Sequence, residues 1–193
     1  MNLNKIAFTT LGCKVNLYDT EAMIELFEKE GYQLVDFDEV ADVYVINTCT
    51  VTNLGDKKSR QMIRRAKTLN PNSIIVATGC YSQVAPEEVS KIEGINIVIG
   101  TKNRLEIVET VKKYQEEHKT DVLNTVSDIM KERIFEPLSI SELKDRTRAY
   151  LKIQEGCNRF CTYCIIPFAR GPVRSRKPED VIEEVEKLAK NGF

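Results

Sequence analysis

The sequence predicts an α/β fold built around a parallel sheet. Three observations lead to this class: short, continuous apolar runs recur through the first hundred residues, segments with helical apolar spacing separate them, and turn residues mark the junctions. Parallel strands are joined by crossover helices, and strands buried on both sides read as continuous apolar runs. We therefore expect a parallel sheet covered by helices on both faces.

The predicted elements of this first region alternate regularly. Strands are predicted at 6–11, 43–47, 73–78 and 95–99, and helices at 17–31, 54–69, 86–92 and 107–118. The strands are short runs such as VYVIN and SIIVAT, and the first helix repeats its periodic positions three and four residues apart from Leu17 to Phe27. Gly31 and Asn70–Pro71 are stop signals, and Pro86 suits the first turn of a helix.

The remainder of the chain predicts a connector and a second, smaller unit. Residues 119–145 lack clear periodicity, Arg148–Gln154 alternates like a strand, and Pro178 opens a helix that ends at Asn191–Gly192. We therefore expect a first domain over 1–118, a connector over 119–147 and a second unit over 148–193.

Composition narrows the class of protein. The 193 residues are 42% hydrophobic and 30% charged with a net charge of −1, an ordinary balance for a globular protein. No apolar run reaches the roughly 20 residues that span a bilayer, and the first residues make a poor secretory signal. We therefore expect a cytoplasmic protein without a membrane partner. Six cysteines beside a single histidine then favour metal or redox chemistry over disulfides.

Three cysteines lie close together in the second unit. Cys157, Cys161 and Cys164 form the pattern C-x3-C-x2-C between a predicted strand and a predicted helix. Three thiolates can bind three irons of a cubane cluster and leave the fourth iron open to a chelating substrate. The alternatives are a zinc site or buried thiols, but zinc lacks a visible fourth ligand, because His118 is distant and lies in a predicted helix.

The other three cysteines share a structural context. Cys13, Cys49 and Cys80 each follow a predicted strand, so all three should reach the carboxyl edge of the sheet, where ligands bind in such folds. Small or turn-forming residues adjoin them, which would let a ligand approach the backbone closely: Gly12, Asn47, Thr48 and Gly79. A second metal site and a set of structural thiols both remain open on this evidence.

These motifs resemble those of the radical S-adenosylmethionine methylthiotransferase family. The resemblance lies in the C-x3-C-x2-C pattern with Tyr163 before its last cysteine, and in four segments: Thr10–Asn16, Asn47–Val51, Thr78–Gln83 and Gly156–Gly171. The segment TLGCKVN-x-YDTEAM is similar to the corresponding segment of the branch that acts on N6-threonylcarbamoyladenosine in tRNA. It is less similar to the isopentenyladenosine branch or to the branch that modifies a ribosomal protein.

The resemblance implies a fold, two cofactors and a reaction. The fold would be a flavodoxin-like, doubly wound methylthiotransferase domain followed by the first βα unit of a truncated radical S-adenosylmethionine (β/α) barrel. One 4Fe-4S cluster, at Cys157, Cys161 and Cys164, would bind and cleave S-adenosylmethionine beside Tyr163. A second 4Fe-4S cluster, held by Cys13, Cys49 and Cys80, would handle sulfur. The family inserts sulfur into a C–H bond of the adenosine at position 37, next to the anticodon, and methylates it. That chemistry requires an electron donor and the tRNA anticodon loop as partners.

Basic residues near the second cysteine set suggest contact with RNA. Residues 144–177 carry a net charge of +7, and the rest of the chain carries −8. Arg170, Arg174 and Arg176 are the candidate phosphate contacts, and the basic helix predicted at 54–69 is a second candidate. A solvated basic surface is the alternative in both cases.

Length limits what this chain is expected to do alone. A complete barrel takes about 250 residues, so the 46 residues over 148–193 hold one βα unit. We therefore expect a truncated chain that is inactive by itself. The alternatives are a methylthiotransferase for another adenosine or a protein substrate, a non-catalytic iron–sulfur or RNA-binding fragment, and a zinc or disulfide protein.

Overall fold

A six-stranded parallel sheet forms the centre of the molecule. The computed structural model describes residues 5–50, 53–140 and 149–192. The strands are β1 (Lys5–Thr10), β2 (Gln33–Val35), β3 (Val43–Thr48), β4 (Ile74–Gly79), β5 (Ile97–Val98) and β6 (Leu123–Asn124). Their order across the sheet is β2-β1-β3-β4-β5-β6, and every neighbouring pair is parallel. The predicted parallel α/β class is therefore confirmed.

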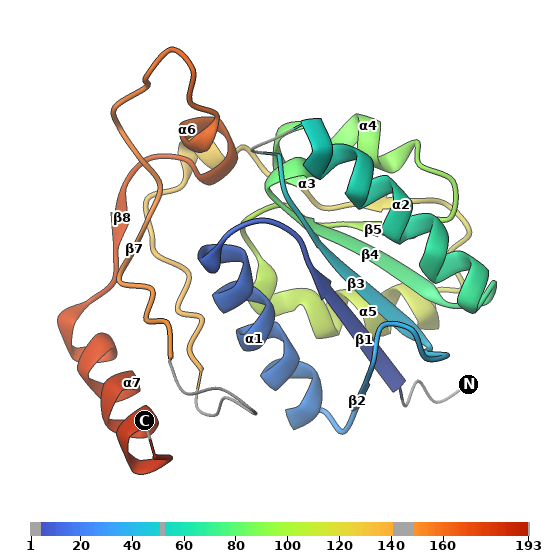
Figure 1. Cartoon of the computed structure of the whole chain (residues 1–193), viewed down its shortest axis with the longest axis horizontal. Helices are drawn as coiled ribbons and strands as arrows, with labels where there is room; N and C mark the ends of the chain where they lie inside the picture. The colour runs from blue at the N-terminus through green and yellow to red at the C-terminus, as the bar shows by residue number, and fades with distance from the viewer. Residues whose placement is uncertain (1–4, 51–52, 141–148, 193) are drawn as a thin grey trace.

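Helices cover both faces of this sheet (Figure 1). The helices of the N-terminal region are α1 (Lys14–Lys29), α2 (Asn53–Leu69), α3 (Cys80–Val84), α4 (Pro86–Ser90) and α5 (Ile107–Glu116), with a short 3-10 turn at Arg104–Glu106. Side chains of α1 and α5 pack on one face, and side chains of α2, α3 and α4 pack on the other. The helices switch faces along the chain, which makes the domain doubly wound with the flavodoxin-like strand order.

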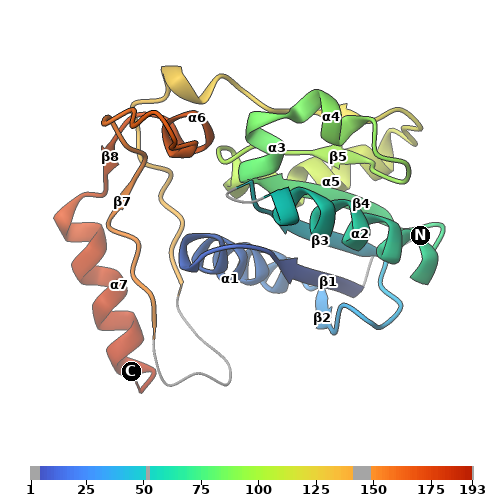
Figure 2. The ribbon, with the colours of Figure 1, turned by 45° about the horizontal axis from the view of Figure 1, so that its top comes forward.

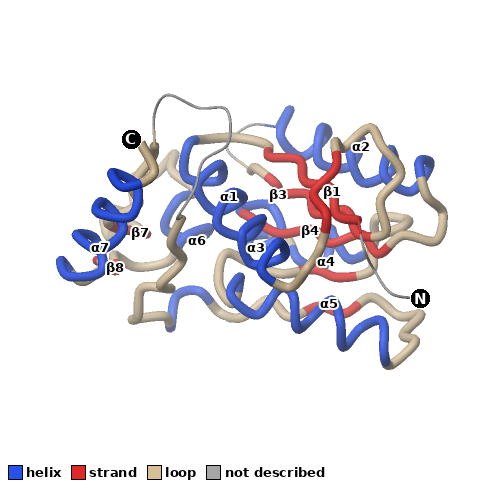
Figure 3. Tube along the Cα trace, turned by 90° about the horizontal axis from the view of Figure 1, so that it is seen from below, coloured by secondary structure: helices blue, strands red, loops and turns tan. Residues whose placement is uncertain are grey.

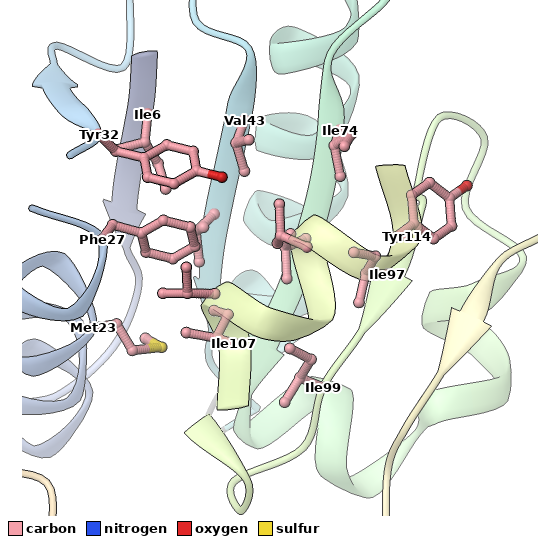
Figure 4. Close-up of a cluster of buried hydrophobic side chains, with 14 residues drawn as sticks. Ile6, Met23, Phe27, Tyr32, Val43, Ile74, Ile97, Ile99, Ile107 and Tyr114 are labelled. Carbon is pink, nitrogen blue, oxygen red and sulfur yellow. The ribbon is translucent and has the colours of Figure 1, made fainter. Parts of the chain in front are cut away.

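The alternation of side chains along the central strands explains both cores. On β3, Val43 and Val45 face α1 and α5, while Tyr44 and Ile46 face the opposite layer. Figure 4 shows the first of these cores, with Phe27 of α1 against the strands. Every residue of β3 and β4 is buried, as expected for strands covered on both faces.

The second part of the chain packs beside α1 and α3, along one side of the sheet domain (Figures 1, 2 and 3). Its elements are the 3-10 turn at Ile129–Lys131, β7 (Gln154–Glu155), α6 (Ile166–Arg170), β8 (Arg174–Ser175) and α7 (Pro178–Lys190). Tyr18 and Ala22 of α1 form a small apolar core with Leu138 and Ile140. No helix in the described ranges has both the length and the apolar character to cross a membrane.

Several short elements differ from the sequence prediction. The predicted strand at Arg148–Gln154 is wrong in extent: Arg148 lies outside the described residues, and pairing with antiparallel β8 begins only at Gln154. The ladder is short because β8 supplies two residues. The elements α3, α6 and β2, and β6 within the expected connector, span between two and five residues. Such lengths are too short to reveal a period.

Candidate metal centre

The structure places the first three cysteines at the carboxyl ends of adjacent parallel strands. Cys13 lies between β1 and α1, Cys49 directly follows β3, and Cys80 directly follows β4 as the first residue of α3. Cys49 and Cys80 are buried and Cys13 is exposed, and all six cysteines of the chain are free thiols. The shared edge follows from the parallel sheet, in which all carboxyl ends face the same way.

Asn16, on the first turn of α1, joins the loops that carry these thiols. Its side-chain amide donates to the carbonyl of Leu11 at 2.7 Å and to the carbonyl of Thr48 at 2.9 Å. The Asn47 amide in turn donates to the Asn16 carbonyl at 2.8 Å. Because Asn16 is fully buried, these bonds fix the β1–α1 loop against the end of β3.

Gly12 lets these two loops come close together. Its φ of +105° lies in the region that favours glycine, and a Cβ at this position would stand 2.7 Å from the Cys49 sulfur. The space beside the Cys49 sulfur therefore depends on residue 12 being glycine, which has no side chain.

The second three cysteines lie on a loop between β7 and α6. The Cys157 amide donates to the Gly171 carbonyl at 3.0 Å, and the Cys164 amide donates to the Cys161 carbonyl at 2.9 Å. Cys161 is exposed, Cys157 and Cys164 are half-buried, and Tyr163 is 91% exposed. The start of the loop is thus tied to Gly171, a local turn forms at Cys161–Cys164, and Cys161 and Tyr163 face solvent.

The chemistry of both donor sets fits iron–sulfur clusters. No group of three or more His, Cys, Asp or Glu side chains within the described residues is arranged around one metal ion. A cubane cluster does not require that arrangement, because each thiolate binds a different iron. Both sets consist of free thiols, which are the usual ligands of such clusters. The assignment of the six cysteines and Tyr163 as ligands stays a prediction.

A buried cluster of charges joins the two parts of the chain that carry the cysteine sets. Asp19 of α1 and Glu155 of β7 are its central carboxylates, and four cations surround them: Arg104, Lys152, Arg170 and Arg174. Lys152 lies 2.5 Å from Asp19, and Arg170 lies 2.7 Å from the same carboxylate. Buried charges are costly unless they are paired, and these ion pairs join α1 of the first part to β7 and α6 of the second.

The cations set the charge state of both carboxylates. Burial by itself raises the pKa of Asp19, but Arg104, Lys152 and Arg170 outweigh it and hold that pKa well below its usual range. The same balance of burial against these cations lowers the pKa of Glu155 to about 2. Burial raises the pKa of Cys80, and the Arg170 guanidinium opposes that rise.

Sequence reasoning missed Asp19 and Glu155 as members of the site. The available signal was a carboxylate at position 19, beside the apolar positions of the first helix. That signal does not identify partners that lie more than 80 residues away, such as Arg104 and Arg170.

The three arginines predicted to contact RNA are buried in ion pairs. Arg170 and Arg174 bind Glu155, and Arg176 binds Glu184 of α7. Their side chains are between 3% and 5% exposed. Contact with RNA through these residues stays a prediction, and the structure gives each of them a carboxylate partner inside the protein.

Matches to two family models identify a radical S-adenosylmethionine protein with an added N-terminal domain. Residues 151–193 match the radical SAM superfamily, and residues 5–100 match the family described as "Uncharacterized protein family UPF0004". Taken together with its relatives, the chain belongs to the radical S-adenosylmethionine methylthiotransferase family. Membership of this family implies S-adenosylmethionine and iron–sulfur cofactors.

Named relatives show which enzymes the chain is similar to. It is 55% identical over 97% of its length to threonylcarbamoyladenosine tRNA methylthiotransferase MtaB of Bacillus subtilis, and 44% identical over 98% to MtaB of Aquifex aeolicus. It is 37% identical over 97% of its length to the ribosomal protein uS12 methylthiotransferase RimO of Clostridioides difficile. The matches cover 41%, 46% and 42% of those three proteins, so the chain spans less than half the length of each.

Proposed function

We propose that the chain forms the cofactor-binding part of a cytoplasmic tRNA methylthiotransferase that modifies N6-threonylcarbamoyladenosine at position 37. The observation that carries this proposal is the buried charge cluster that joins the two parts of the chain, each of which carries three free cysteines. The choice of substrate is supported by relatives named for threonylcarbamoyladenosine, at 55% and 44% identity, above the 37% of the uS12 relative.

Each cysteine set is proposed to hold one 4Fe-4S cluster. Cys157, Cys161 and Cys164 would bind the cluster that meets S-adenosylmethionine, and Cys13, Cys49 and Cys80 would bind the other. When bound, these groups supply one-electron reduction of the sulfonium and a carrier for sulfur, which acid–base side chains do not provide. The proposed parts are residues 1–118 for the sulfur-handling domain, 119–147 for the connector and 148–193 for the start of the barrel.

The two cysteine sets would hold their clusters in environments that differ in exposure to water. In the first set, Cys49 and Cys80 are buried and Cys80 contacts Arg170 of the second part, whereas Cys13 is exposed. The loop of Cys161 and exposed Tyr163 leaves the second set open to a small ligand. The open loop suits S-adenosylmethionine, and the anticodon loop of tRNA and an electron donor are the further partners of this proposal.

Anaerobic reconstitution with iron and sulfide tests the two-cluster proposal. We expect about eight irons in the unmodified chain and about four in each of two matched variants, Cys157→Ala and Cys49→Ala, because each variant disables one set. Iron and acid-labile sulfide analysis provides the measurement. Bound zinc without iron, or full iron retention in either variant, would contradict the proposal.

The substrate is tested on tRNA from cells that lack the gene. Mass spectrometry of the nucleosides should show loss of the methylthio group from the threonylcarbamoyl nucleoside alone. Loss from the isopentenyl nucleoside, or from a ribosomal protein, would assign the chain to another branch.

A further inference from the structure

Arg170 connects the second part of the chain to the first cysteine set. It is the last residue of α6, shortly after the loop of Cys157 to Cys164, yet its Nε donates to the Cys80 sulfur at 3.3 Å. The two residues are 90 positions apart in the sequence. The guanidinium is therefore a direct contact between the segment that holds one cysteine set and a thiol of the other set.

Three further partners fix the orientation of this guanidinium. Its Nη1 donates to Asp19 at 2.7 Å and also to Glu155, and its Nη2 donates to the side-chain oxygen of Asn16. Asn16 is the residue that joins the loops before Cys13 and Cys49. A planar guanidinium held at all three nitrogens has little freedom, so the donor that faces Cys80 is held in place.

Burial strengthens the effect of this contact on the sulfur. The Arg170 side chain is 5% exposed and Cys80 is 4% exposed, so water screens their interaction weakly. A cation that donates to a thiolate favours additional negative charge on that sulfur and on any iron bound to it. Hydrogen bonds to sulfur and nearby charge are among the factors that set cluster potentials.

We propose that Arg170 is a positioning residue of the site formed by Cys13, Cys49 and Cys80. The site is complete only when the segment that carries Cys157, Cys161 and Cys164 is docked against α1 and α3. This inference rests on the proposed function, in which the first set holds a cluster. It adds that Arg170, from the second part of the chain, donates a hydrogen bond to Cys80, a proposed ligand of that cluster.

The test isolates the first cluster in the whole chain. In a background with Cys157, Cys161 and Cys164 all changed to Ala, the reconstituted protein should hold one cluster, and redox titration followed by electron paramagnetic resonance gives its midpoint potential. Arg170→Gln should lower this potential, because it removes a positive charge and a donor from the Cys80 sulfur. The matched variant Arg174→Gln removes the same charge from the cluster and should lower the potential by less, because Arg174 contacts Glu155 and the Pro172 carbonyl and not the Cys80 sulfur.

The two arginine variants separate positioning from a purely structural role. Both break the same buried ion cluster, so both should lower the thermal midpoint. An equal change of potential in both variants, or an unchanged potential in Arg170→Gln, would overturn the inference. Arg170→Lys keeps the positive charge but lacks the planar guanidinium. We expect this variant to fold and to lower the potential, by less than Arg170→Gln does. If Arg170→Gln does not fold, an unchanged potential in Arg170→Lys would count against the inference. A background that binds no iron would overturn the first cluster and this inference together, whereas an iron-loaded background with equal potentials would overturn the inference alone.

Discussion

Gly12 links the shape of the first cysteine set to a single backbone conformation. We expect Gly12→Ala to lower the free energy of unfolding by about 2–4 kcal/mol, because it combines a strained positive φ with a contact of 2.7 Å to the Cys49 sulfur. Gly31→Ala is the matched control, with φ of +83° and no atom within 4 Å of the added carbon, so it should cost about 1 kcal/mol. Urea unfolding measures both. Equal costs would contradict the packing argument.

Glu155 makes the stability of the molecule depend on pH. Its pKa of about 2 lies below the ordinary value of 4.5, so its contribution is complete above about pH 4.5 and is lost as the pH falls towards 2. We expect the unmodified chain to lose roughly 3 kcal/mol through this group across that window. Glu155→Gln should show a shallower dependence, whereas Glu183→Gln should change the slope much less, because Glu183 is exposed to solvent beside Lys187. Urea unfolding at several pH values measures these slopes, and identical slopes in all three proteins would refute the expectation.

At the scale of elements, the buried carboxylate of Glu184 contributes to holding α7 against the rest of the protein. Glu184 pairs with Arg176 and accepts hydrogen bonds from the Tyr18 hydroxyl at 2.9 Å and from the Ile140 amide at 3.2 Å. Its other helical neighbours include exposed side chains such as Ile182 and Val185. The helix therefore depends on a polar anchor as well as on apolar contacts such as buried Leu188.

Replacement of that anchor should loosen α7 selectively. We expect Glu184→Ala to cost about 3–5 kcal/mol, because it leaves the Arg176 guanidinium buried without its carboxylate. Glu183→Ala removes an exposed carboxylate from the same helix and should cost less than about 1 kcal/mol. Urea unfolding measures the costs, and hydrogen exchange over 178–190 shows where protection is lost. Equal protection in both variants would argue against the anchor.

At the scale of the whole molecule, the exposed and the buried basic residues differ in how accessible they are to an RNA phosphate. Lys57, Lys58 and Arg64 lie exposed on α2, whereas Arg170 and Arg174 are buried in ion pairs. Exposed cations can reach a phosphate backbone without first breaking an internal pair. For the proposed tRNA substrate, α2 is thus the more accessible of the two basic regions predicted from the sequence.

Neutralisation of α2 tests this difference. We expect the triple change of Lys57, Lys58 and Arg64 to Gln to weaken tRNA binding and to make the salt dependence shallower by up to about 2 logarithmic units per decade of salt. The same change at Lys29, Lys112 and Lys113 removes equal charge from helices on the opposite face of the sheet and should have little effect. Filter binding at several salt concentrations provides the measurement. Unchanged binding by the α2 variant would favour contact through Arg170, Arg174 and Arg176.

The longer predicted strands and helices of the first domain agree closely with the structure, because periodicity in long segments reports burial. The strand predicted at 43–47 is found at Val43–Thr48, and the helix predicted at 54–69 is found at Asn53–Leu69. The prediction for the second unit is less accurate, since β7 and β8 are two residues each and depend on pairing with one another. Short elements stabilised by tertiary contacts leave little periodic signal.

The sequence by itself determined the parallel α/β organisation and the position of Cys13, Cys49 and Cys80 at one sheet edge. Both follow from local spacing, because strands joined by crossover helices all point the same way. Only the tertiary structure decided that Arg170 meets Cys80 and Asp19, which lie 90 and 151 positions away. Burial excludes water from these charges, so they must find partners inside the protein, and the packing of the whole chain selects those partners.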